Sequence, residues 1–109
     1  MRKLIYVASP YSSPYANVAH DRYIATMEYC ASLVKQQQFV FSPVVHWHPF
    51  ALYCDLPTDF HYWKEYNFYM LLLSDQLNVL TLDGWKESIG VTGEIAFAQS
   101  QNIPICYVT

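Results

Sequence analysis

Four short apolar runs, separated by longer stretches with helical periodicity, constrain the fold of this 109-residue chain more than any other feature. They cover Leu4–Ala8, Phe39–Phe41, Leu77–Leu82 and Ile103–Val108. Leu4–Ala8 is continuously apolar, which is typical of a strand that is buried on both faces, as in parallel sheets. Alternation of strands with helices requires right-handed crossovers, which place helices on both faces of the sheet. The sequence therefore predicts one α/β domain over residues 1–109, a three-layer αβα sandwich of flavodoxin or Rossmann type around a four-stranded parallel sheet.

The stretches between the strands predict three helices and one long loop. The first helix is expected from an N-cap at Ser13 to about Gln38, the second from Thr58 or Asp59 to about Leu73, and the third from Ser88 to about Asn102. Inward-facing Val91, Ile95 and Ala98 give the third helix its apolar stripe, as helical spacing requires. Residues 44–58 are rich in aromatic residues and proline, so we expect a loop whose length suggests a function.

Charge, hydropathy and cysteine usage exclude several functional classes. A hydrophobic share of 53% excludes a disordered chain, and a net charge of −3 without a basic stripe argues against binding a nucleic-acid polymer. The chain passes from Arg2 and Lys3 directly into a short strand, and no apolar run is long enough to span a membrane, so we expect no membrane partner. Three cysteines without a CxxC pair predict a reduced, cytoplasmic setting, with Cys30 and Cys106 as buried thiols.

The predicted topology also predicts where a ligand binds. In open parallel sheets, ligands bind beyond the carboxyl ends of the strands. Polar, proline and aromatic residues follow the first three strands, and these ends supply the predicted binding residues Ser9, Pro10, Ser12, Ser42, His46, Gly84, Trp85, Ser88 and Gly90.

The only three glycines of the chain, Gly84, Gly90 and Gly93, all lie in this region. Glycines at the start of a helix allow its free N–H groups to approach an anion, whose charge the helix dipole favours. The alternative is that Gly90 and Gly93 only permit close packing of the helix. Glu94 follows them amid small and apolar residues, and two interpretations stay open: it complements the helix dipole, or it is a partly desolvated nucleophile or base.

Motifs spread over nearly the whole chain resemble the nucleoside 2-deoxyribosyltransferase-like superfamily. The matching segments are Ile5-Tyr6-Val7-Ala8-Ser9-Pro10-Tyr11, Phe41-Ser42-Pro43, Asp75 through Asp83-Gly84-Trp85, and Ser88-x-Gly90-x-x-x-Glu94-Ile95-x-x-Ala98. The chain is most similar to a branch of small proteins with a GWxxSxGxxxE signature, and the 2'-deoxynucleoside 5'-phosphate N-hydrolases share its Ser-x-Gly-x-x-x-Glu spacing.

This resemblance implies N-glycosidic bond chemistry without a cofactor, with hydrolysis favoured over base transfer. Glu94 would attack the anomeric carbon of a deoxyribose, as the nucleophile of a retaining glycosidase does, and Tyr6 would orient it. The alternative for Tyr6 is a purely structural core position. Serine at position 88 is the residue found in members that act on nucleoside 5'-monophosphates, and Gly93 would leave room for the sugar beside Glu94.

One position departs from the superfamily pattern. An aspartate thought to protonate the departing base is expected eight residues before Asp75, where this chain has Asn67. Asparagine can form hydrogen bonds but cannot deliver a proton at neutral pH, so Asp83, Asp59 or Glu65 would have to substitute, and Asp83 or Asn67 is expected near the sugar or base. The departure leaves a second hypothesis open: a protein that binds or sequesters a nucleotide or nucleoside without turnover.

Two other groups of residues are weaker candidates for a site, and one aromatic stretch is expected to form a contact surface. His46, His48 and His61 lack a carboxylate or cysteine at ligand spacing, so we expect no metal, and Cys54 with His46 lacks an orienting third group. The stretch 53–69 carries more aromatic side chains than one core needs. Part of this belt is expected to stack on a base or to bury itself in a homo-oligomer, as superfamily members generally do.

Overall fold

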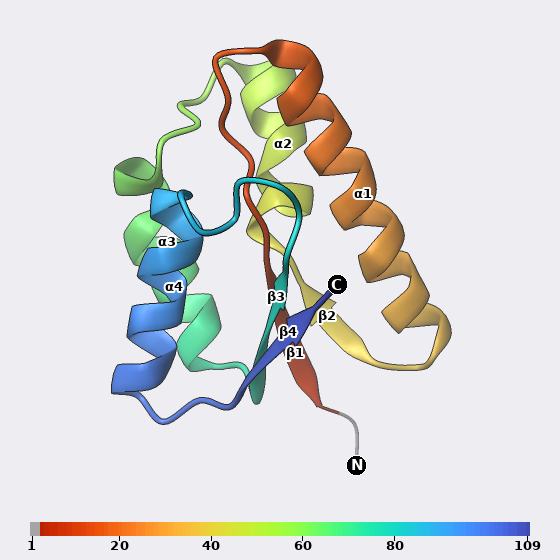
Figure 1. The fold of residues 1–109 in the computed structure, drawn as a ribbon, viewed down its shortest axis with the longest axis vertical. Coiled ribbons are helices and arrows are strands. Elements are labelled where there is room, and N and C mark those ends of the chain that lie inside the picture. The colour runs from red at the N-terminus through yellow and green to blue at the C-terminus, as the bar shows by residue number, and fades with distance from the viewer. Residues whose placement is uncertain (1–2) are drawn as a thin grey trace.

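A computed structural model describes residues 3–109, and Arg2 lies outside the described residues. Its elements, in chain order, are β1 (Leu4–Ala8), α1 (Ala16–Lys35), β2 (Phe39–Phe41), α2 (Pro43–Cys54), α3 (Phe60–Leu72), β3 (Gln76–Leu80), α4 (Ile89–Ser100) and β4 (Ile105–Val108). The four strands form one sheet in the order β2-β1-β3-β4, and every neighbouring pair is parallel (Figure 1). The predicted three-layer α/β sandwich is confirmed.

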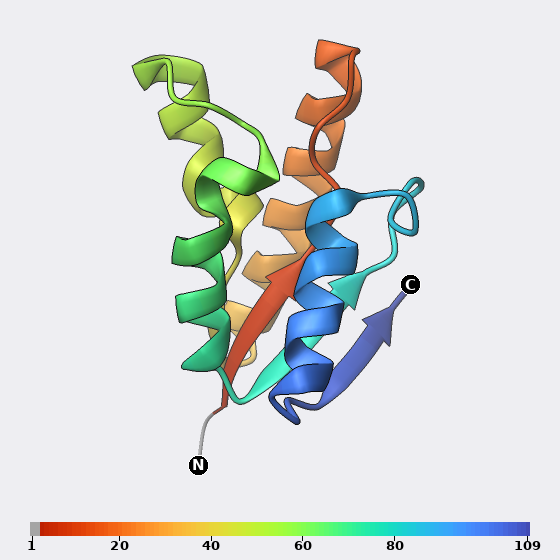
Figure 2. The same cartoon turned by 90° about the vertical axis from the view of Figure 1, so that its left-hand side faces the viewer.

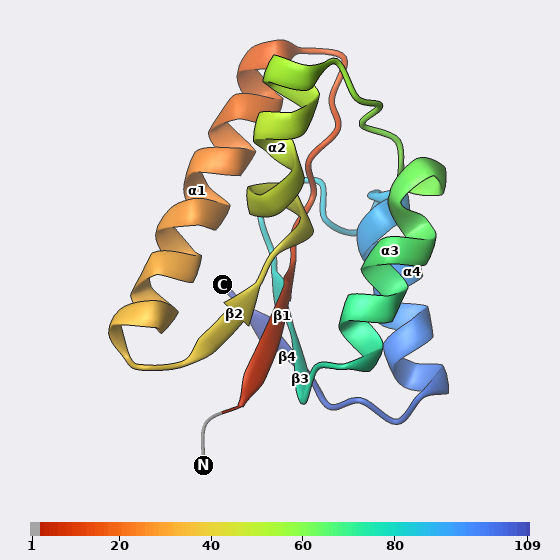
Figure 3. The same cartoon turned by 180° about the vertical axis from the view of Figure 1, so that it is seen from behind.

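Alternating residues of β1 and β3 supply the two cores that hold the layers together. On one face Ile5 and Val7 pack with Cys30 and Leu33 of α1. On the other face, Tyr6 and Leu77 belong to the core that includes Leu71 of α3 and Val91 and Ala98 of α4. Figure 2 shows α3 and α4 side by side in front of the sheet, and Figure 3 shows α2 beside α1 and above β2. All carboxyl ends of the strands therefore point to the same edge.

The expected loop at residues 44–58 is wrong over most of its length, because α2 occupies residues 43–54. Ser42 is its N-cap, and the Ser42 hydroxyl accepts a hydrogen bond from the Val45 amide at 3.1 Å. Pro43 follows at the first helical position, where the missing N–H costs nothing. The Ser-Pro pair that ends β2 is thus also a helix start, and a second proline, Pro49, is accommodated inside the helix.

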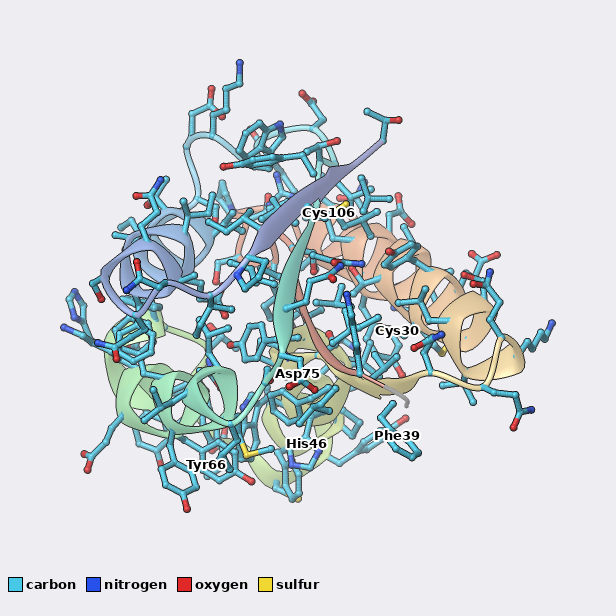
Figure 4. The ribbon with its side chains drawn as sticks, turned by 90° about the horizontal axis from the view of Figure 1, so that it is seen from below. Cys30, Phe39, His46, Tyr66, Asp75 and Cys106 are labelled. Atoms are coloured by element: carbon cyan, nitrogen blue, oxygen red, sulfur yellow. The ribbon has the colours of Figure 1, made fainter. Side chains whose placement is uncertain are left out.

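Two smaller expectations also need correction. Tyr15, not Ser13, is the N-cap of α1, and the Ser13 hydroxyl instead accepts from the Tyr15 amide at 3.1 Å, in the turn that precedes the helix. Cys106 is exposed, because β4 is an edge strand, whereas Cys30 is buried as predicted and its burial raises the pKa of the thiol to about 11 (Figure 4).

Candidate functional site

A cavity of about 580 Å³ lies at the carboxyl ends of the strands, where the topology predicts a site. Its walls come from the loop after β1, from α1, α2 and α3, from the loop after β3, and from the first turns of α4. Eight of the predicted site residues line it: Ser9, Ser12, Asn67, Asp83, Gly84, Ser88, Gly90 and Glu94. Residues far apart in the sequence thus converge on one pocket.

Glu94 is the buried acid of this pocket. It lies in the second turn of α4, and only 3% of its surface is exposed. The hydroxyl of Tyr6, which is fully buried on β1, donates a hydrogen bond to Glu94 Oε2. β1 and α4 therefore hold the carboxyl group in one orientation, with the neighbouring pocket as its opening to a ligand.

Burial dominates the electrostatics of this pair. Desolvation raises the pKa of Glu94 to about 8, although the hydrogen bond from Tyr6 acts in the opposite direction. The pKa of Tyr6 is well above its usual value, first because of burial and then because of the adjacent Glu94 charge. Tyr6 is therefore a neutral donor. Once ionised, Glu94 is a poorly hydrated carboxylate, which is the form that attacks an electrophile or accepts a proton.

The N-terminus of α4 forms the polar end of the pocket. Ser88 is the N-cap, and its hydroxyl oxygen accepts from the Val91 amide at 3.2 Å. The amides of Ile89 and Gly90 belong to the first turn, where N–H groups have no partner within the helix. Free amides, a hydroxyl proton and the helix dipole together favour an anion at this place.

Arg22, which is not among the site residues predicted from the sequence, adds a positive charge to the pocket. Its guanidinium donates to the carbonyl oxygens of Ser12 at 2.8 Å and Asp83 at 3.1 Å, so that it bridges the loops after β1 and β3. Gly84 makes this approach possible: its φ is +90°, and a Cβ there would lie 2.5 Å from Arg22 Nη2. The sequence signal that could have identified Arg22 is its position within the otherwise apolar, inward-facing stripe of α1.

Gly93 has a different role from the one expected. A Cβ at Gly93 would lie 2.6 Å from Cζ of Phe60, the first residue of α3, so the ring already occupies the space beside the glycine. The expectation that Gly93 leaves room for a sugar is therefore wrong, because packing between α3 and α4 uses that room. A Cβ at Gly90 would lie 3.6 Å from Cδ1 of the same ring, which is an ordinary contact distance.

Two stacked indoles and one amide line the opposite wall. The rings of Trp47 on α2 and Trp63 on α3 lie 3.8 Å apart and nearly parallel. Nε1 of Trp47 donates to Oδ1 of Asn67 at 3.0 Å, and Nε1 of Trp63 donates to the carbonyl oxygen of Pro57 at 2.7 Å. Both N–H groups are therefore satisfied inside the protein, and the rings present carbon surface to the pocket.

His48 forms a further polar cluster in the pocket wall. Its Nδ1 lies 2.7 Å from the hydroxyl oxygen of Tyr11, and its ring stacks on Tyr23 with 3.9 Å between centroids. Burial, followed by the nearby His20, lowers the pKa of His48, so its imidazole is neutral at pH 7. His48 is not among the site residues predicted from the sequence, because it lies on α2, where a loop is expected from the sequence.

Five predicted site residues do not line the pocket. Tyr6 lies behind Glu94, Pro10 is buried, and Ser42 caps α2. His46 faces away, stacked against Tyr66 on the outer side of α2 and α3 (Figure 4), and Trp85 packs against Tyr107 of β4. Within residues 3–109, no three histidine, cysteine or acidic side chains are grouped to hold a metal ion, and no helix is long and apolar enough to cross a membrane.

Fold and site together define an α/β protein with a four-stranded parallel sheet. A large pocket lies at the edge where the carboxyl ends of the strands meet, and the buried Glu94 is part of its lining. The chain belongs to the family described as "Domain of unknown function (DUF1937)", whose profile matches residues 3–109. No curated protein matches it.

Proposed function

We propose that this protein hydrolyses the N-glycosidic bond of a 2'-deoxynucleoside 5'-monophosphate, as a member of the nucleoside 2-deoxyribosyltransferase-like superfamily. The observation that carries the proposal is the buried Glu94, held by Tyr6 beside a pocket whose other end is built for an anion. A glutamate with a purely structural role would not have to border a cavity. Glutamate side chains are also almost never fully buried unless they are paired or functional.

The reaction would proceed in two displacements at the anomeric carbon. Ionised Glu94 attacks C1' of the deoxyribose, the bond from C1' to the base nitrogen breaks, and the base leaves with that electron pair and takes a proton from water. Water then adds to C1', the ester bond to Glu94 breaks, and deoxyribose 5-phosphate leaves as the carboxylate is restored. Tyr6 positions the carboxylate throughout. Transfer to another base in place of water is the variant of the same second step.

The phosphate would bind at the N-terminus of α4. Ser88 and the amides of Ile89 and Gly90 supply hydrogen-bond donors, and Arg22 supplies a full positive charge across the mouth of the pocket. Serine at this position donates to a phosphate without the repulsion that an acidic side chain would create. A 5'-phosphate at this end would place the sugar toward Glu94 and the base toward the indoles.

A binding function without turnover is the second candidate, and one observation favours it. Asn67 stands where a proton donor for the departing base is expected, and its oxygen is occupied by the Trp47 indole N–H. Neither Asn67 nor the neutral Tyr6 protonates a base at neutral pH. The same pocket could then hold a nucleotide without cleaving it.

Release of free base decides between these candidates. The protein is incubated with each deoxynucleoside monophosphate, and the free base is separated by chromatography for the wild type, Glu94→Gln and the control Glu28→Gln. Glu28 is an exposed glutamate on α1, outside the pocket, so its substitution controls for the chemistry of the change. We expect base from the wild type and Glu28→Gln only. Release that persists in Glu94→Gln contradicts the nucleophile assignment, and binding without release by the wild type establishes the second candidate.

We further propose that the protein works as a homo-oligomer in the cytoplasm. Tyr62, Tyr66, Tyr69 and Leu73 recur at helical spacing along α3 and its end, and each is 45–63% exposed. Such a stripe is typical of an interface. Sedimentation of the wild type and Tyr69→Glu tests the assignment: we expect the substitution to dissociate the oligomer, and a monomeric wild type at micromolar concentration contradicts it.

A further inference from the structure

We infer that Asn67, held by Trp47 against a pair of stacked indoles, forms a base-recognition site that selects a carbonyl oxygen over an amino group on the nucleobase. This inference rests on the proposed function, because it requires that the pocket holds a nucleotide. The inference assigns Asn67 a role in substrate selection, whereas the sequence indicated only that Asn67 replaces the expected aspartate.

Asn67 presents a donor to the pocket. The side chain is 6% exposed and lines the cavity, and Trp47 Nε1–H at 3.0 Å fixes its Oδ1 as an acceptor. Its amide orientation is thereby determined, because the indole nitrogen can only donate. No hydrogen bond within residues 3–109 uses the Nδ2 group of Asn67. Among the described residues every fully buried side-chain nitrogen has a hydrogen-bond partner, so Nδ2, which has none, is open to the pocket and can donate to a ligand that supplies an acceptor there.

Of the three side chains Trp47, Trp63 and Asn67, only Asn67 offers a polar group to the pocket. The indole N–H groups of Trp47 and Trp63 both donate hydrogen bonds within the protein, to Asn67 and to Pro57. Each ring therefore offers only carbon surface to a ligand. Asn67 and Trp63 lie four residues apart on α3 and therefore face the same side of the helix. A flat base packed on these rings would bring its edge to the Nδ2 donor, since stacking accepts every base and the amide reads the edge.

A donor at this position distinguishes two classes of base. Thymine, uracil, guanine and hypoxanthine carry a carbonyl oxygen where cytosine and adenine carry an amino group. An amino group would face the Asn67 donor with a donor of its own, which leaves both N–H groups unpaired in a dry pocket. Loss of one buried hydrogen bond corresponds to roughly a tenfold change in affinity. We therefore expect dUMP to bind about tenfold more tightly than dCMP, and dIMP more tightly than dAMP by a similar factor.

Calorimetric titration of the Glu94→Gln protein with these four nucleotides tests the inference. Each pair differs at the group in question and in the protonation of the adjacent ring nitrogen, and the missing nucleophile prevents turnover during the titration. Asn67→Asp is then introduced in the same background: its carboxylate can still accept from Trp47, while its second oxygen accepts from an amino group and repels a carbonyl. We expect the preference to reverse. Asn17→Asp, at an exposed position of α1, is the matched control and should keep the preference.

Two kinds of outcome would overturn the inference: results that contradict base reading by Asn67 alone, and a result that also removes the proposed function. Equal affinity within both pairs, or a preference that survives Asn67→Asp in a folded protein, shows that Asn67 does not read the base although nucleotides bind. Failure of all four nucleotides to bind removes the proposed function together with the inference. Tryptophan emission and far-ultraviolet circular dichroism of each variant establish that it is folded, and quenching of Trp47 and Trp63 on binding would report base stacking directly.

Discussion

Replacement of Glu94 by glutamine should make the protein more stable at high pH and remove a large part of its pH dependence. The Glu94 pKa of about 8 in the folded protein compares with an ordinary glutamate pKa of 4.5. Between these values the folded state holds a proton that the unfolded state has lost, so the free energy of unfolding falls as pH rises. The contribution is complete below pH 4.5 and is lost by about pH 8. Each pH unit in this window corresponds to about 1.4 kcal/mol, and the whole window to about 5 kcal/mol.

Urea denaturation of the wild type and Glu94→Gln at pH 5.5, 6.5 and 7.5 measures this difference. The glutamine oxygen can still accept from Tyr6 and carries no charge, so the variant resembles the protonated site at every pH. We expect wild-type stability, relative to the variant, to fall by about 3 kcal/mol over these two pH units. All other titrating groups are shared and cancel in the comparison. Parallel stability curves would refute the claim that burial holds a proton on Glu94.

Substitutions at Gly84 and Ser88, with Gly90→Ala as a control, test how the anion end of the pocket is built. Gly84→Ala should lower the free energy of unfolding by about 1–2 kcal/mol in urea denaturation, because φ is +90° and the Cβ would displace the Arg22 guanidinium; Gly90→Ala, which meets only ordinary contacts, is the control and should not destabilise. Ser88→Ala should cost about 1 kcal/mol through loss of the cap on Val91, whereas Ser88→Asp keeps the cap and should weaken monophosphate binding, as measured by calorimetry. Unchanged monophosphate affinity in Ser88→Asp would contradict a phosphate at this place.

Much of the fold was predictable because the strands carry their own signal. The run that forms β1 is buried on both faces, which is why it is continuously apolar rather than alternating, and β3 keeps this pattern apart from the buried Asn78. Helix α2 was not predicted for two physical reasons. Ser42 and Pro43 are typical both of the end of a strand and of the start of a helix. Pro49 lies inside the helix, where proline lacks the N–H group of a helical hydrogen bond and therefore argues against a helix. The wrong prediction that Cys106 is buried has another origin, because the sequence alone does not reveal that β4 lies at the edge of the sheet.

The site was predictable where it depends on one segment and not where it depends on packing between segments. Ser88 and Glu94 share one helix, so their spacing could be read directly. Arg22 reaches the pocket only because Gly84, far along the chain, permits its approach. Likewise, the orientation of the Asn67 amide is set by Trp47 on another helix. Pairings of this kind have no periodicity in the sequence, so only the three-dimensional structure reveals them.

The raised pKa of Glu94 leads to opposite pH trends for base release and for nucleotide binding. The attacking species is the carboxylate, so base release from the bound complex should increase as pH rises through about 8. Binding alone should show the reverse trend, since an ionised Glu94 repels a phosphate that is already a dianion above pH 7. Dissociation constants and single-turnover rates for one monophosphate between pH 6.5 and 9, for the wild type and Glu94→Gln, separate the two. We expect wild-type affinity to fall with pH relative to the variant while its rate of release rises. Affinity that falls in parallel for both proteins would show that Glu94 stays protonated or lies too far from the ligand to sense it, and in either case it could not be the nucleophile.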